Sequence, residues 1–169
     1  MPRSEYEIII PNEKDGHSLL KLIAGIENFK LEDIACIEGL WREFLHGGNE
    51  PDRYHFLIAK AGYKLLGFAC YGHRPLTTGT YDFYWLAVAP NFRESGIGHA
   101  LMKSVENGIR ALGGYLAVIE TSGLISFSST RAFYLSCGYQ LVVQIPDFYH
   151  PGDDLVIFTK RLMIRSGNG

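Results

Sequence analysis

The spacing of apolar residues changes near Gly47 and Gly48, and this change constrains the fold more than any other feature. Before it, apolar residues recur every three or four positions in two segments, typical of amphipathic helices, and the two glycines end the second one. After it, the spacing is that of strands. The helical segments are 15–26 and 31–45, and the strand-like ones are two runs within 54–72, turning near Ala61 and Gly62, and one over 80–88. Three consecutive strands predict an antiparallel meander.

The rest of the chain alternates again between helical and strand-like spacing. Helical spacing returns over 96–112, and a short apolar strand over 115–121 follows, which a helical connection would bring in parallel. A short helix is expected next, with Ser128 or Ser129 as N-cap and Gly138 as C-cap. The remaining strands are expected over 5–11, 139–146 and 154–162. The predicted fold class is α/β with a mixed sheet, in the order β-α-α-β-β-β-α-β-α-β-β.

Composition and charge exclude several classes of protein. The 169 residues suit one domain, expected over 1–169 with a flexible tail at 164–169. A formal net charge of −2 argues against a nucleic-acid-binding protein, which needs a concentrated basic face. No apolar run reaches the roughly 20 residues that span a bilayer, and the N-terminus becomes charged too soon for a signal peptide. The three cysteines lack CxxC spacing, so we expect reduced thiols, no metal site and a cytoplasmic location.

A loop with two glycines carries the strongest functional signal. The segment APNFRESGIGHAL, residues 89–101, leads from a strand into a helix whose first amides and dipole favour an anion. A P-loop is excluded because no Gly-Lys-Ser/Thr follows. A dinucleotide-binding loop would match at Gly96 and Gly98, with Glu120 as the ribose-binding acid. Leu101, however, stands where the third glycine belongs, and the strands upstream are expected to be antiparallel.

RESGIG, residues 93–98, resembles the Arg/Gln-x-x-Gly-x-Gly/Ala loop of the GNAT superfamily of acyl-CoA-dependent N-acyltransferases. The resemblance covers nearly the whole chain, because the meander, the parallel strand and a later helix with Phe-Tyr before Cys-Gly-Tyr occur in the same order. TRAFY, residues 130–134, and DFYHPGDD, residues 147–154, are similar to segments of small bacterial members. The resemblance implies the GNAT fold and an acetyltransferase that uses acetyl-CoA.

The resemblance assigns coenzyme A to two backbone segments. Amides of the loop would bind the pyrophosphate, with glycines where the phosphates approach too closely for a Cβ. The edge of the preceding strand would pair with the pantetheine, and a bulge near Leu86 and Ala87 would turn an amide toward the thioester oxygen. The assigned residues are Leu86, Ala87 and Val88 in the strand and Arg93, Glu94, Ser95, Gly96, Ile97 and Gly98 in the loop.

The start of the later helix departs from the family pattern. Many members carry an asparagine at the position of Phe127, where it would bond the pantetheine arm. Three hydroxyl side chains are left to replace that contact here: Ser128, Ser129 and Thr130. Arg131 either contacts coenzyme A or covers the surface of the helix.

The resemblance also implies catalytic residues. Tyr134 would protonate the departing thiolate, since a phenol with a pKa near 10 is a proton donor at neutral pH; the alternative is a core tyrosine. Asp82 or Glu120 would act as the general base, or neither, because a carboxylate at a strand end is often only solvated or capping. By strand alternation, Asp82 is expected to share a face with Tyr84 and Leu86.

The acceptor is expected to be a primary amine of a small molecule or peptide, attacking directly in a ternary complex. Aromatic faces beside carboxylates suit an ammonium group, although the same residues serve a core or a hairpin turn. These residues are Tyr81, Tyr84, Trp85, Asp147, Phe148, Tyr149 and His150. The alternative is a non-catalytic acyl-CoA-binding or sensing module. Quaternary state is left open, with a homodimer as one option.

Overall fold

The computed structural model describes residues 5–47 and 53–162. Its strands form one seven-stranded sheet in the order β1-β2-β3-β4-β5-β7-β6. They are β1 (Glu7–Ile9), β2 (Tyr54–Ala61), β3 (Lys64–His73), β4 (Thr80–Val88), β5 (Leu116–Ser122), β6 (Gln140–His150) and β7 (Asp153–Arg161). Among the strands of the described residues, only β4 and β5 pair in parallel. The mixed α/β fold, the meander β2–β3–β4, the parallel strand and the final hairpin are therefore confirmed.

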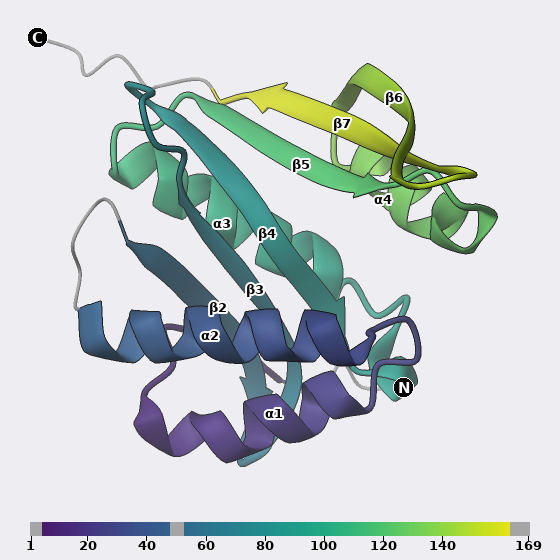
Figure 1. Ribbon diagram of the computed structural model, residues 1–169. Coiled ribbons are helices and arrows are strands. Elements are labelled where there is room, and N and C mark those ends of the chain that lie inside the picture. The colour runs from purple at the N-terminus through teal and green to yellow at the C-terminus, as the bar shows by residue number, and fades with distance from the viewer. Residues whose placement is uncertain (1–4, 48–52, 163–169) are drawn as a thin grey trace, which may run out of the picture.

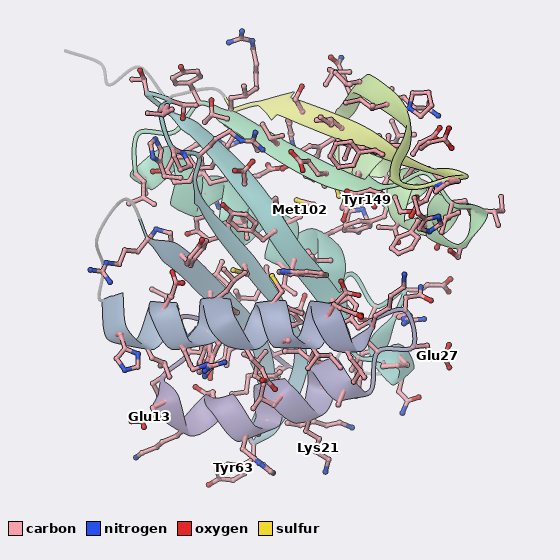
Figure 2. The ribbon with its side chains drawn as sticks, in the orientation of Figure 1. Glu13, Lys21, Glu27, Tyr63, Met102 and Tyr149 are labelled. Atoms are coloured by element: carbon pink, nitrogen blue, oxygen red, sulfur yellow. The ribbon has the colours of Figure 1, made fainter. Side chains whose placement is uncertain are left out.

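Helices cover both faces of the sheet (Figure 1). They are α1 (Gly16–Ala24), α2 (Leu31–Gly47), α3 (Ile97–Ala111) and α4 (Ser128–Ser136), with single 3₁₀ turns at Glu13–Asp15, Pro90–Phe92 and Ile125–Phe127. The helices α1 and α2 pack on one face through residues such as Leu19 and Trp41. On the other face α3 buries an apolar stripe that includes Leu101 and Met102, the latter labelled in Figure 2. Charged side chains such as Lys21 are exposed.

Some predicted boundaries are wrong, for local reasons. The N-cap of α4 is Phe127 and not a serine, because the 3₁₀ turn Ile125–Phe127 leads directly into the helix and Ser128 is already helical. Gly138 follows the C-cap Cys137 with a φ of 85°, so a glycine does end the helix, one position later. β6 is longer than predicted and continues to His150, where a tight turn joins it to β7.

A few predictions fall outside the described residues. These are the tail at 164–169 and the role of Gly48 as a helix stop. Within the described ranges, none of the helices combines the length and apolar character needed to cross a bilayer.

Candidate active site

The centre of the candidate site is the place where β4 and β5 separate. The two strands pair over only four residue pairs, from Thr80 with Leu116 to Phe83 with Ile119. Beyond Phe83, β4 continues to pair with β3 on one side, while β5 continues with β7. Figure 1 shows the two strands diverging from this point. The second edge of residues 84–88 therefore has no strand partner in the described part of the chain, which leaves main-chain groups for a ligand.

A bulge in β4 lies at the start of the separation. Trp85 is opposite Cys70 and Phe83 is opposite Tyr71, so Tyr84 is the extra residue. The sequence had placed the bulge near Leu86 and Ala87, two residues later. An extra residue inverts the alternation of side chains that follow it.

The bulge therefore changes which residues share a face. Phe83 and Leu86 both pack on the α3 side of the sheet, whereas Trp85 and Ala87 pack on the side of α1 and α2. The expected common face of Asp82 and Leu86 is wrong for this reason. Tyr84 remains beside Asp82, and these two residues line one cavity.

The glycine loop that leads into α3 is exposed to solvent. Residues 93–96 are exposed, and Gly96 is the N-cap with a φ of 86°. Glu94 also has a positive φ, of 61°. The amide of Gly98 has no carbonyl four residues earlier within the helix, as is usual for a first turn. The loop therefore lies at the positive end of a helix dipole, which suits an anion.

The two glycines are required for different reasons. A Cβ on Gly96 would meet nothing within 4 Å, so its positive φ is what favours glycine there. A Cβ on Gly98 would approach Phe133 of α4 to 3.3 Å, so the close packing of α3 against α4 favours glycine. Contact with another helix thus gives a structural reason for glycine at position 98, and the close approach of phosphates at both positions stays a prediction.

Tyr134 lies on α4 at the edge of the core. It is 9% exposed and packs against Phe133 and Phe158. Burial, with a smaller contribution from Cys137, raises the pKa of Tyr134 to about 12. Its hydroxyl makes no hydrogen bond within the described residues. The side chain is thus a neutral phenol at physiological pH, with its proton available to a ligand.

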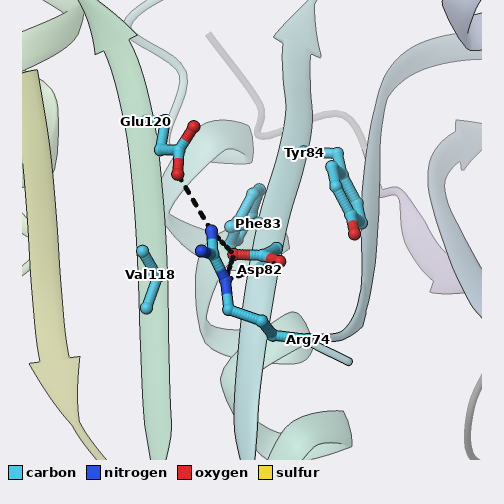
Figure 3. A pocket seen from close by; sticks show the side chains of 6 residues that line it. All are labelled: Arg74, Asp82, Phe83, Tyr84, Val118 and Glu120. Carbon is cyan, nitrogen blue, oxygen red and sulfur yellow. Dashed lines mark hydrogen bonds and ion pairs between the residues drawn. The ribbon is translucent and has the colours of Figure 1, made fainter. Parts of the chain in front are cut away.

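The two candidate bases are joined by a residue that the sequence did not single out, Arg74. Its Nε lies 2.8 Å from Asp82 Oδ1, and its Nη2 lies 2.6 Å from the same oxygen. Nη2 also lies 2.9 Å from Glu120 Oε1. The hydrogen bonds with Asp82 have the largest effect and raise the pKa of Arg74. Burial lowers this pKa, and the hydrogen bond with Glu120 raises it, so that the net shift is upward. Figure 3 shows the guanidinium between the two carboxylates.

Only part of this cluster had a sequence signal. Arg74 follows β3, and its amide bonds Thr80 O at the start of β4. Gly72 pairs with Asp82, so the register of a hairpin would bring Arg74 diagonally close to Asp82. The contact with Glu120, 46 residues away in the chain, depends on the parallel register of β4 and β5. That register has no local signal.

A cavity of about 100 Å³ lies at this cluster. Its remaining lining residues are Phe83, Tyr84 and Val118. Asp82, Val118 and Glu120 alternate with residues that pack against α3, so they occupy the opposite face of the sheet. Tyr134 belongs to the α3-side cluster. The candidate acid and the candidate bases are thus on opposite faces of the sheet, near the point where its strands separate.

The aromatic and acidic residues expected around an acceptor do not all gather there. Tyr81 is buried against α3, and Trp85 packs edge-on against Phe29. Asp147 accepts a hydrogen bond from the amide of Gly152, which is hairpin turn chemistry. Tyr149 lies closer: burial, followed by the charges of Glu120 and Asp153, raises its pKa.

The other residues that were predicted to contact the acceptor or coenzyme A are Phe148 and His150 in β6 and three residues on α4. Phe148 stacks edge-on against Tyr149, and His150 Nε2 lies 3.6 Å from Asp153 Oδ2. Arg131 donates hydrogen bonds to the carbonyl oxygens of Ser122 and Leu124, each at 2.8 Å, and so ties α4 to the end of β5. Two further residues expected to bind coenzyme A are solvent-accessible at the start of α4: Ser129 and Thr130. No group of three or more His, Cys, Asp or Glu residues in the described ranges is arranged to hold a metal ion.

Comparisons with known proteins agree with this geometry. Residues 52–141 match the family model described as the acetyltransferase (GNAT) domain. A GNAT-family protein from Desulfovibrio desulfuricans is 33% identical, with a TM-score of 0.89 over 94% of this chain and 100% of that one. The ribosomal-protein-S18-alanine N-acetyltransferase of Escherichia coli is 16% identical, with a TM-score of 0.73 over 98% of this chain and 99% of that one.

An aminoglycoside 6'-N-acetyltransferase complexed with coenzyme A has the same fold, with 16% identity and a TM-score of 0.73 over 94% of this chain and 98% of that one. No curated protein matches the chain in sequence. The family model spans more than half of the chain, and the Desulfovibrio relative spans nearly all of it. The chain therefore belongs to the GNAT acetyltransferase family.

Proposed function

We propose that this protein is an N-acetyltransferase that moves an acetyl group from acetyl-CoA to a primary amine of a small molecule or peptide. One observation carries the proposal: the edge of residues 84–88, which has no strand partner in the described part of the chain, leads through the turn at Pro90–Phe92 to the exposed loop 93–96 before α3. A ligand with an anionic end and an extended amide-bearing arm fits such a surface. Coenzyme A has both parts.

The residues that would hold the coenzyme lie along this path. Amides of the loop from Arg93 to Gly98 would bind the pyrophosphate, where the helix dipole stabilises negative charge. Main-chain groups of Leu86, Ala87 and Val88 would pair with the pantetheine as an added strand. Ser129 and Thr130 at the start of α4 remain candidates for the contact that an asparagine makes in other members.

The chemistry follows from groups on the two faces of the sheet. The acceptor nitrogen, after losing a proton, attacks the thioester carbonyl, so that a C–N bond forms and the C–S bond breaks. The proton leaves the ammonium group for a carboxylate or a water molecule. The departing thiolate takes the phenolic proton of Tyr134. The nitrogen loses a second proton as the amide forms, and a proton from solvent restores the phenol. No acyl-enzyme is needed, and Cys137 is only partly exposed beside the end of α4.

A thiol-release assay tests this proposal. The purified protein is mixed with acetyl-CoA and with a panel of amines that includes diamines, amino acids, an aminoglycoside and a peptide N-terminus. We expect coenzyme A release that depends on one class of amine, with the acetylated amine identified by mass spectrometry. Binding of acetyl-CoA without release for any amine would contradict catalysis.

One observation favours a second function, a non-catalytic acyl-CoA-binding module. Both candidate bases are paired with Arg74, and Asp82 is bonded through both of its oxygens, as in a purely structural ion pair. The same assay distinguishes the two functions, because a sensing module would bind acetyl-CoA in calorimetry but leave the thioester intact.

A further inference from the structure

Arg74 spans the gap that opens between β4 and β5. It reaches Asp82 on β4 and Glu120 on β5 with one guanidinium group. Arginine suits this position because its planar fork presents several donors in a fixed geometry, whereas lysine is a point charge. The two strands stop pairing at Phe83 and Ile119. The arginine therefore joins Asp82, within the last paired residues of β4, to Glu120, the first residue of β5 beyond the pairing.

The two carboxylates are held differently. Asp82 uses both oxygens, since Oδ1 and Oδ2 lie 2.8 and 3.0 Å from Arg74 Nε, and its side chain is only 13% exposed. Glu120 uses one oxygen, Oε1, and its side chain is 42% exposed. Its Oε2 has no hydrogen bond within the described residues. Asp82 is thus committed to the arginine, while Glu120 keeps one oxygen for a ligand.

The charge of the cavity favours a cation. One guanidinium faces two carboxylates, which leaves a net charge of −1. Burial and the charge of Asp82 raise the pKa of Tyr84, and Tyr149 is shifted in the same direction. Both phenols are therefore neutral and leave this balance unchanged. An alkylammonium group would neutralise the excess negative charge.

The size of the cavity limits the acceptor further. Its volume is about 100 Å³, and a water molecule occupies about 30 Å³ of liquid. The space therefore holds roughly three heavy-atom groups, such as an ammonium and two methylenes. Tyr84 and Val118 give the methylenes an apolar wall. An unbranched chain needs less width beside the nitrogen than a chain that is branched at that carbon.

We propose that Arg74 is the positioning residue of the acceptor site, which fixes Asp82 and holds Glu120 with one oxygen free to receive an unbranched primary alkylammonium. This inference rests on the proposed function and adds a residue and a substrate class to it. The ammonium transfers one proton to Glu120, which becomes a neutral carboxylic acid, and the amine attacks. Glu120 later releases that proton to solvent. Arg74 exchanges no proton and acts only through the carboxylates.

The test compares two amines of equal size and charge, n-butylamine and sec-butylamine, with saturating acetyl-CoA. The native protein should use n-butylamine at least about 10-fold better in kcat/KM, the discrimination that a tight pocket gives against one misplaced methyl group. Equal use of both amines would overturn the assignment of substrate class.

The role of Arg74 is tested with Arg74→Gln, Arg74→Lys and the control Arg42→Gln, which changes an exposed arginine on α2. Arg74→Gln should lower kcat/KM for n-butylamine by about 10²-fold, as misplacement of a reacting group does. The loss should fall on kcat and on the KM for n-butylamine, with the KM for acetyl-CoA unchanged, because Arg74 acts only on the acceptor side. Arg74→Lys should recover only part of the rate, and Arg42→Gln should match the native protein. An unchanged kcat/KM for n-butylamine in Arg74→Gln, or an equal rise in the KM for acetyl-CoA, would refute the positioning role.

Further measurements distinguish a misfolded variant, a wrong division of roles between the carboxylates and a wrong proposed function. Thermal unfolding and acetyl-CoA calorimetry establish that Arg74→Gln is folded and binds the coenzyme; if it does not fold, Arg74→Lys carries the comparison. Glu120→Gln should lose more turnover than Asp82→Asn, and the opposite order would refute the division of roles. If the native protein releases no thiol, the proposed function fails. The inference then depends on an NMR titration with n-butylammonium, in which unperturbed amides at Tyr84 and Glu120 would refute it.

Discussion

Tyr134→Phe separates a catalytic phenol from a core tyrosine more sharply than any other substitution. The change removes one oxygen from a side chain that is 9% exposed and packed between aromatic rings. Because that oxygen has no hydrogen-bond partner in the described residues, its loss leaves no other group unpaired. The free energy of unfolding should therefore change by less than about 1 kcal/mol.

The effect on turnover should be much larger. General acid catalysis contributes about 10²–10⁴-fold. The pKa of about 12 makes Tyr134 a weak acid, so we expect the lower end of this range, about 10²-fold in kcat, or about 2.7 kcal/mol of transition-state stabilisation. Acetyl-CoA affinity should be retained, because the phenol donates its proton only as the thiolate departs.

The assay combines thiol release, calorimetry and a pH–rate profile. A pKa of about 12 keeps Tyr134 protonated up to pH 10, so a basic limb below that pH belongs to another group and should persist in Tyr134→Phe. Unchanged kcat in a folded, coenzyme-binding variant would refute the role of Tyr134 as the acid. A basic limb that disappears on substitution would refute the pKa argument.

Two other substitutions test the loop and the stability of the fold. Gly96→Val should abolish acetyl-CoA binding in calorimetry, because a β-branched residue does not tolerate a φ of 86°. The matched control is Gly62→Val, in a hairpin turn with a φ of 58°, which should bind acetyl-CoA normally. Normal binding by both variants would contradict the loop assignment. Burial alone would raise the pKa of Asp15, but its bonds with Lys60 and the amide of Asn12 lower it. A lowered folded-state pKa contributes stability above the unfolded value of about 3.9 and loses it as the pH falls. In urea titrations, Asp15→Asn should thus lower the free energy of unfolding by about 1–3 kcal/mol at pH 7 and by less at pH 3. An equal decrease in the free energy of unfolding at both pH values would show that the charge is not responsible.

The sequence predicted those parts of the fold that depend on local patterns. A run rich in aromatic residues placed β4 at Thr80–Val88 with correct ends. The helical stripe of Ile97 and Leu101 defined the buried face of α3. Turn residues with positive φ, such as Gly62, marked the hairpins. Each of these features arises from interactions over a few residues, so the pattern and the structure agree.

The site depended on longer-range geometry, and there the sequence was less informative. The bulge at Tyr84 has no local signal, because one extra residue in a strand looks like any other strand residue. The expected face of Leu86 was wrong as a consequence. Arg74 was missed because its partner Glu120 is brought near only by the parallel pairing of β4 and β5. Sequence patterns thus identified the candidate carboxylates, but not the cation that joins them.

A crystal structure with bound acetyl-CoA tests the central claim most directly. We predict pyrophosphate oxygens at about 3 Å, the length of a hydrogen bond, from amides between Glu94 and Gly98. The pantetheine should lie along residues 84–88, with the thioester between the hydroxyl of Tyr134 and the cavity at Arg74. Acetyl-CoA bound elsewhere, with the edge of β4 and the first turn of α3 both unoccupied, would contradict the account.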